Sequence, residues 1–118
     1  MSRSRRRTAG KSDADFTLDL ICGRWKASIL MELRRGPQRT GKLVRALQGV
    51  SKNRLNDALR ELRRSGIIRR RVYPGPVPRV EHELTALGKT LCPIVNDLHA
   101  WGLRSRRKVV SARAARRQ

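Results

Sequence analysis

A mainly α-helical fold with one small β-hairpin, an α+β arrangement, is predicted from three observations on this chain of 118 residues. Apolar residues recur at helical spacing in five successive stretches. Two runs that favour extended structure flank the proline-rich segment from Pro74 to Pro78, which forms a loop. Between Arg39 and Glu83, a short helix, a turn, a second helix and this hairpin follow one another without a gap. One domain is expected, because a chain of this length supports a single modest core.

The first two predicted helices precede a Gly-Pro pair at residues 36 and 37. Ser12 or Asp13 caps a short helix that ends at about Cys22, with Phe16 and Leu20 on one side. A second helix spans residues 24 to 35 and ends at the Gly-Pro pair. Its apolar residues are expected to form the scaffold of the core, and they are Trp25, Ile29, Leu30 and Leu33.

Two further helices are separated by a turn at residues 48 to 50. The first runs from Thr40 to Leu47, and the second begins after the N-cap residue Ser51 and continues to Ser65, before Gly66. Steps of about 100° per residue place an apolar seam on one side of this second helix, made of Leu55, Ala58, Leu59 and Leu62. The opposite side is expected to face outward and carries Asn53, Asn56, Asp57, Arg60 and Arg64.

The two strands of the hairpin are predicted at residues 67 to 73 and 79 to 84. Because side chains alternate along a strand, Arg69 and Arg71 share one face and Arg70 points to the other. Arg79 lies on the same face as Glu81, two residues further on, and can form an ion pair with it. Helix, turn, helix and hairpin in this order are typical of a winged helix-turn-helix, whose second helix enters the major groove of DNA.

The last helix is predicted from Ala86 to about Arg104, with Thr85 as its cap. Its apolar stripe is too long for so small a domain to cover, and an uncovered stripe of this extent indicates an interface. We therefore expect a homodimer held by the first and last helices. The residues assigned to this interface are Phe16, Leu20, Leu87, Leu91, Ile94, Leu98 and Trp101.

The net charge of +20 is unevenly distributed along the chain. Residues 1 to 12 carry five basic residues and no acid, and residues 104 to 118 carry seven and no acid. Segments of this kind are normally solvated and disordered, and a polyanion is their natural partner. We expect a basic arm over residues 1 to 12, a winged helix-turn-helix and dimerisation domain over 13 to 105, and a basic C-terminal tail over 106 to 118.

Several function classes are disfavoured by what the sequence lacks. No apolar run approaches the ~20 residues that span a bilayer, and no secretory signal precedes the domain, so a cytoplasmic protein without a membrane partner is expected. We predict no enzyme, no cofactor and no metal site, because no phosphate-binding glycine loop or paired-carboxylate pattern occurs. His82 alternates with two glutamates on opposite strand faces, and it and His99 are expected at the surface or in an interface. Cys22 and Cys92 are expected to be reduced, buried thiols.

Four short motifs in a fixed order carry a resemblance to a known family. Gly23-Arg-Trp-Lys, Pro78-Arg-Val-Glu, Leu84-Thr-Ala-Leu-Gly and Trp101-Gly resemble the HxlR family of bacterial winged-helix regulators, relatives of the MarR type. The resemblance implies a homodimer that binds double-stranded DNA at a pseudo-palindromic operator, as a repressor or an activator, in the bacterial cytoplasm and in association with the nucleoid. The alternative is a nonspecific nucleoid-architectural or RNA-binding basic protein, although few aromatic residues are present for stacking on single-stranded bases.

The residues expected to contact DNA lie at the start of the third helix, on the fourth helix and on the hairpin. They are Arg39, Thr40, Ser51, Lys52, Asn53, Arg54, Asn56, Arg60, Arg64, Arg69, Arg71 and Arg79. Asn and Arg side chains on one helix face are suited to bidentate contacts with adenine and guanine edges.

Family members often sense oxidants through a cysteine just ahead of the first helix, and that position is Ser12 here. Cys22 and Cys92 therefore stay as candidates for redox-sensitive thiols. The identity of a small-molecule effector is not indicated by the sequence. A pocket lined by residues such as Trp25, Ile29 and Trp101 would accept a small apolar molecule, but the same residues also suit a plain core.

Overall fold

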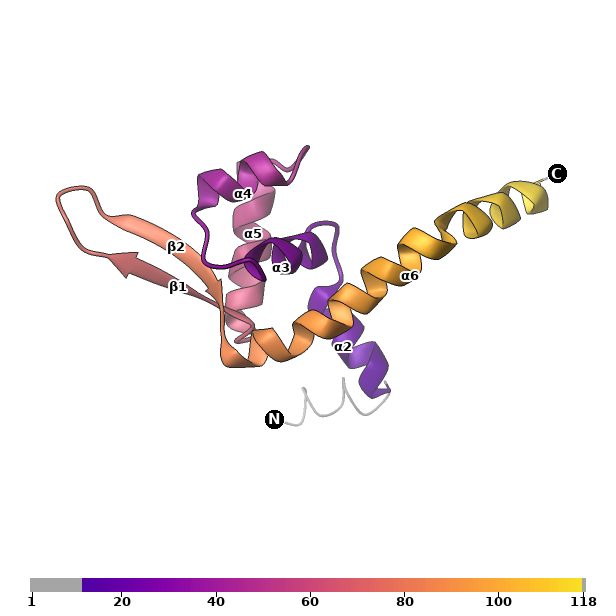
Figure 1. Cartoon of the computed structure of the whole chain (residues 1–118), viewed down its shortest axis with the longest axis horizontal. Coiled ribbons are helices and arrows are strands. Elements are labelled where there is room, and N and C mark those ends of the chain that lie inside the picture. Colours follow the sequence, from indigo (N-terminus) through magenta and orange to yellow (C-terminus); the bar gives the residue numbers. More distant parts are fainter. Residues whose placement is uncertain (1–11, 118) are drawn as a thin grey trace.

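The computed structural model describes residues 12–117, so the expected basic arm up to Lys11, and Gln118, lie outside the described residues. The predicted fold class, a mainly α-helical chain with one hairpin, is confirmed (Figure 1). The elements follow the predicted order: α2 (Asp13–Ile21), α3 (Lys26–Leu33), α4 (Thr40–Ala46), α5 (Lys52–Arg64), β1 (Ile68–Tyr73), β2 (Arg79–Leu84) and α6 (Ala86–Arg117).

Serine side chains cap two of the helices as predicted. The Ser12 Oγ accepts a hydrogen bond of 3.1 Å from the backbone N–H of Asp15 at the start of α2. The Ser51 Oγ accepts one of 3.1 Å from the backbone N–H of Arg54 at the start of α5. Each bond satisfies a backbone donor that has no partner within its helix, which fixes where the helix begins. At the other end of α5, Gly66 has φ of 74°, which glycine adopts without strain.

The core gathers around α3, which contacts α4, α5, β2 and α6. Fully buried side chains come from α3, α4, α5, β1 and α6, and they include Ile29, Leu30, Leu43, Leu55, Leu59, Ile68 and Val95. The predicted seam of α5 is confirmed, because Leu55, Ala58, Leu59 and Leu62 are all buried. Packing of this seam against the scaffold fixes which side of α5 faces solvent.

The hairpin is an antiparallel pair in which Arg69 lies opposite Glu83 and Arg71 lies opposite Glu81. Two backbone hydrogen bonds also connect β2 to the turn before α4. The N–H of Gln38 donates to the carbonyl of His82 at 2.9 Å, and the N–H of His82 donates to the carbonyl of Gln38 at 2.8 Å. The hairpin is therefore attached to the helix-turn-helix segment at its base.

The end of the last helix was predicted wrongly. Instead of ending at about Arg104, α6 continues to Arg117 and is 32 residues long. Its C-terminal half projects away from the body of the molecule (Figure 1). Ala, Arg and Lys are strong helix formers, and no Gly or Pro follows Gly102, so backbone propensity favours a longer helix. No helix in the described range 12–117 is both long and apolar enough to cross a membrane.

The start of α6 is fastened to the end of α5 through Thr85 and Gly88. The Thr85 Oγ accepts the backbone N–H of Gly88 at 3.0 Å, as predicted for a cap, and donates to the carbonyl of Gly66 at 2.6 Å. A Cβ atom on Gly88 would lie 2.0 Å from the carbonyl oxygen of Ile67. Only glycine allows the helix to approach this backbone so closely, which gives a physical reason for the motif Leu84-Thr-Ala-Leu-Gly.

Candidate nucleic-acid interface

The outward face of α5 presents polar side chains that the structure leaves exposed. Asn53, Asn56, Arg60 and Arg64 are all exposed and lie on the side opposite the buried seam. A second contact fixes the rotation of the helix, since Lys26 of α3 forms an ion pair with Glu61 on the flank of α5. The two amides and two guanidiniums are thus held in one row on a helix whose orientation the core determines.

One of these arginines already has an acidic partner on the same helix. The Arg60 Nη1 lies 3.3 Å from the Asp57 Oδ1, and both side chains are more than half exposed. An exposed ion pair at this spacing contributes only about 0.2 to 1 kcal/mol. It orients the guanidinium of Arg60, yet little free energy is needed to break it. Arg60 is therefore available to a stronger anionic or base-edge partner.

The residues at the start of α5 divide between two directions. Ser51 uses its hydroxyl as the helix cap, while Lys52 beside it is exposed. Arg54 is exposed on the flank of α5, where it lines a shallow hollow with Cys22 and Trp25. The structure therefore leaves Lys52 exposed at the N-terminal end of α5 and places Arg54 toward the turn between α2 and α3.

At the start of α4, Arg39 is exposed, but the hydroxyl of Thr40 is occupied by the hairpin. The Thr40 Oγ1 lies 2.8 Å from the His82 Nε2. His82 is only 3% exposed, so the expectation of a surface or interface histidine is wrong. Burial, followed by the charges of Arg63 and Arg70, lowers the pKa of His82. A neutral imidazole thus connects β2 to the first helix of the helix-turn-helix.

Three arginines of the hairpin, Arg69, Arg71 and Arg79, gather on one face together with its glutamates, as alternation predicted. Arg69 forms an ion pair with Glu83, and the Arg71 Nη2 lies 3.4 Å from the same Glu83 carboxylate. The Arg79 Nε lies 3.6 Å from the Glu81 Oε2, so the predicted Arg79 to Glu81 ion pair is confirmed. These contacts neutralise part of the positive charge of the hairpin and hold its guanidiniums in fixed directions.

Two residues at this surface were not singled out from the sequence. Arg79 stacks over the Tyr73 ring at 4.6 Å from its centroid, and the Arg71 Nη1 donates to the Tyr73 hydroxyl at 3.4 Å. Arg63 is half-buried, and burial together with the charges of Arg70 and Arg60 lowers its pKa. The sequence did not indicate either residue, because Tyr73 contacts Arg79 on the other strand and Arg63 of α5 interacts with Arg70 of β1. The charges of Arg60 and Arg70 both repel that of Arg63, and a bound phosphate would relieve this repulsion.

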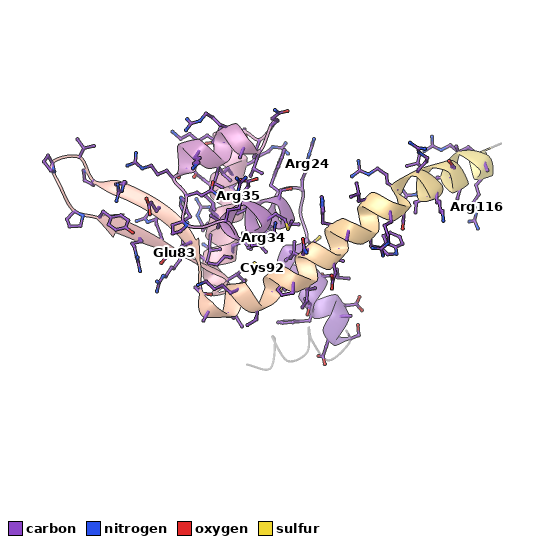
Figure 2. The ribbon with its side chains drawn as sticks, in the orientation of Figure 1. Arg24, Arg34, Arg35, Glu83, Cys92 and Arg116 are labelled. Carbon is purple, nitrogen blue, oxygen red and sulfur yellow. The ribbon has the colours of Figure 1, made fainter. Side chains whose placement is uncertain are left out.

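The two cysteines have different environments. Cys92 is buried on α6, as expected, whereas Cys22 is exposed at the end of α2, so its predicted burial is wrong. Burial raises the pKa of the Cys92 thiol, and the weaker opposing effect comes from Arg34. Cys92 also lines a cavity of about 310 Å³ between the end of α3, β2 and α6. Figure 2 shows the labelled residues Arg34, Arg35 and Glu83 near Cys92.

The apolar residues assigned to the dimer interface fall into two groups. Leu91 is 7% exposed and belongs to the core of the protomer itself, and Leu20 packs partly against that core. The others are exposed by 44% to 58% and are Phe16, Leu87, Ile94, Leu98 and Trp101. Trp101 is 55% exposed, whereas Ile29 is fully buried in the core.

Comparisons with known proteins agree with this architecture. A family model described as HxlR-like helix-turn-helix matches residues 20–109. The HTH-type transcriptional regulator YkvN of Bacillus subtilis (strain 168) is 39% identical over 88 residues, which cover 75% of each chain. The reduced form of the redox regulator HypR superposes with a TM-score of 0.80 at 37% identity, covering 85% of this chain and 99% of HypR. A transcriptional regulator of the MarR family from Enterococcus faecalis V583 superposes with a TM-score of 0.73 at 35% identity, covering 84% and 90%.

Proposed function

Because this chain belongs to the HxlR-like helix-turn-helix family and is a DNA-binding transcriptional regulator, we propose that it acts as a homodimer on a pseudo-palindromic operator. It represses or activates transcription on the bacterial nucleoid in the cytoplasm, and it has no catalytic activity. The observation that carries this proposal is the exposed row of amides and guanidiniums on α5, opposite a seam that is buried along its whole length.

This row reads base edges in the major groove. Asn53 and Asn56 each offer the paired donor and acceptor that adenine requires, and Arg60 offers the paired donors that guanine requires. Lys52 lies next to them at the N-terminal end of α5, which is the end that enters the groove in helix-turn-helix proteins. Arg60 exchanges its exposed contact with Asp57 for a base or a phosphate when DNA binds.

The remaining cations bind phosphates and position the protein on the duplex. Arg64 lies at the C-terminal end of α5, and Arg39 precedes α4. On the hairpin, which acts as the wing, Arg69 and Arg71 share the Glu83 carboxylate, so a phosphate replaces part of an existing ion pair. Contacts of this kind add affinity that falls with salt, and they carry no sequence information.

The homodimer is supported by the apolar side chains that the protomer leaves exposed on α2 and α6. Phe16 lies on α2, and Ile94, Leu98 and Trp101 lie on α6, each at least 44% exposed. Each of these side chains is about half exposed, so covering one contributes about 0.7 to 1.5 kcal/mol, and burial of the whole set favours a stable dimer. A two-fold dimer also places the two copies of α5 about 34 Å apart, which is one turn of the duplex.

The experiment starts from the operator, found by mapping genomic binding sites of the intact protein. Asn56→Ala and Arg60→Ala are each expected to weaken binding to the operator by about 1 to 3 kcal/mol. Each should weaken binding to scrambled DNA much less. Arg71→Ala is the matched control, because removal of a phosphate contact weakens both duplexes alike. Equal losses of affinity on both duplexes in Asn56→Ala would contradict base reading, and a stable monomer at micromolar concentration in sedimentation would contradict the dimer.

A further inference from the structure

The C-terminal end of α6, residues 104–117, is an ordered helix with an extreme charge. It carries seven Lys or Arg residues and no acid, and the last acidic residue before it is Asp97. Within the described residues, none of these seven cations forms an ion pair. Figure 2 shows that Arg116, near the end of α6, lies far from the body of the molecule. We define this segment as the basic end of α6.

Repulsion within the basic end is not relieved by the protein itself. Arg104 lies one helical turn from Lys108, and Arg113 lies one turn from Arg117, and like charges at this spacing destabilise a helix. Most of the segment is exposed, so no packing against the core compensates for the repulsion. A helix that is both charged and unpartnered in this way is completed by an anionic partner.

The distribution of the cations around the helix indicates what kind of anion fits. At about 100° per residue, Arg104, Arg116 and Arg117 fall on different sides, and the remaining four cations lie between them. A folded protein partner would contact one face of the helix and leave the other cations unpaired. A duplex attracts all of them through the field of its phosphates.

A second copy of the chain is a poor source of the missing negative charge. Four of the nine acidic residues already form ion pairs within the protomer, on α5 and in the wing. Asp13 and Asp15 lie in the first turn of α2, where negative charge already interacts favourably with the helix dipole. The acids of a partner copy are therefore too few to neutralise seven cations.

The basic end of α6 lies beyond α5 on the side away from the wing (Figure 1). The wing extends to the opposite end of the molecule from the C-terminus. The basic end and the wing thus flank α5 from two sides.

We propose that the basic end of α6 binds the phosphate backbone of the DNA next to the operator contacts of α5, on the side opposite the wing. This inference rests on the proposed function and adds a third contacting element to α5 and the wing. It contributes affinity that depends on salt and does not distinguish sequences.

The test removes three charges from the basic end and keeps its helix. Arg113→Gln, Arg116→Gln and Arg117→Gln are combined in the full chain, because Gln supports a helix about as well as Arg. The matched control combines Arg113→Lys, Arg116→Lys and Arg117→Lys, which preserves the charge. Affinities for an operator duplex with long flanks and for a scrambled duplex are measured between 50 and 200 mM salt.

The slope of log affinity against log salt is expected to fall by about 0.9 for each phosphate that the variant no longer binds, on both duplexes. The ratio of the two affinities should stay unchanged, and the Lys control should match the wild type. An unchanged slope in the Gln variant would overturn the inference. If the Gln variant also weakened the dimer in sedimentation while its slope stayed unchanged, the basic end would be assigned to a protein contact instead. Failure of the wild type to prefer the operator would instead overturn the proposed function. The slope of log affinity against log salt on scrambled DNA would still show whether the basic end of α6 binds phosphates.

Discussion

Gly88→Ala introduces one methyl group where, among the described glycines, an added Cβ meets the closest neighbour. The new Cβ would lie 2.0 Å from the carbonyl oxygen of Ile67, whereas real Cβ contacts are essentially never below 3.0 Å, so the start of α6 must move by about 1 Å or more. That carbonyl accepts the backbone N–H of Thr85 at 3.1 Å, and the Thr85 hydroxyl caps the helix. Movement of the helix therefore disturbs the cap as well as the packing.

The expected destabilisation combines these two effects. Overpacking a dense site costs about 1 to 3 kcal/mol, and loss of an N-cap costs about 0.5 to 2 kcal/mol. Relaxation shares part of this cost, so we expect the free energy of unfolding to fall by about 2 to 4 kcal/mol, a large part of the stability of a small domain.

The assay is urea unfolding followed by circular dichroism at a fixed protein concentration, because the stability of the proposed dimer depends on concentration. Gly41→Ala in α4 is the control, since its Cβ would lie 3.8 Å from the Arg45 Nη1, an ordinary contact. Alanine should stabilise that helix by about 0.5 to 1 kcal/mol. A Gly88→Ala protein that matches the wild type, or gains stability as Gly41→Ala does, would refute the reasoning.

Two further predictions concern titration and thiol reactivity. Because the pKa of His82 is lowered from its ordinary 6.5 in the folded protein, the unfolded chain binds the proton more readily, and the free energy of unfolding should fall as the pH drops below about 6.5. Denaturation of His82→Gln at several pH values should show a smaller dependence in this range, and an undiminished dependence would assign it to other groups. In reaction with a disulfide reagent, exposed Cys22 should react at least about tenfold faster than buried Cys92, whose pKa burial raises. Cys22→Ser should remove the fast phase, and two equal rates would contradict the assigned burial.

The local features of the fold could be predicted because short-range chemistry determines them. Ser12 and Ser51 cap helices through contacts three residues away, so each helix start is visible in the sequence. The spacing of Leu55, Leu59 and Leu62 fixes the buried side of α5 and therefore its outward face. Alternation placed Arg79 and Glu81 on one strand face, and the ion pair between them followed.

The features that could not be predicted depend on which element covers which face. The apolar stripe of α6 divides into a buried side around Val95 and an exposed side around Ile94. Because both sides are apolar, the sequence did not indicate that Leu91 belongs to the core rather than to the exposed side. Alternation likewise assigned His82 to a strand face without indicating that α4 covers it. Charge density suggested a disordered tail after residue 105, whereas the helix propensity of Ala, Arg and Lys extends the helix to Arg117.

Sequence-specific recognition of DNA by the α5 face is the central claim, and one ratio tests it most directly. The affinity of the intact wild-type protein is measured at physiological salt for its mapped operator and for a scrambled duplex of the same length and composition. A regulator that reads bases through Asn56 and Arg60 should prefer the operator by roughly a thousandfold or more. A ratio near one, with affinity for both duplexes set by salt alone, would contradict the account.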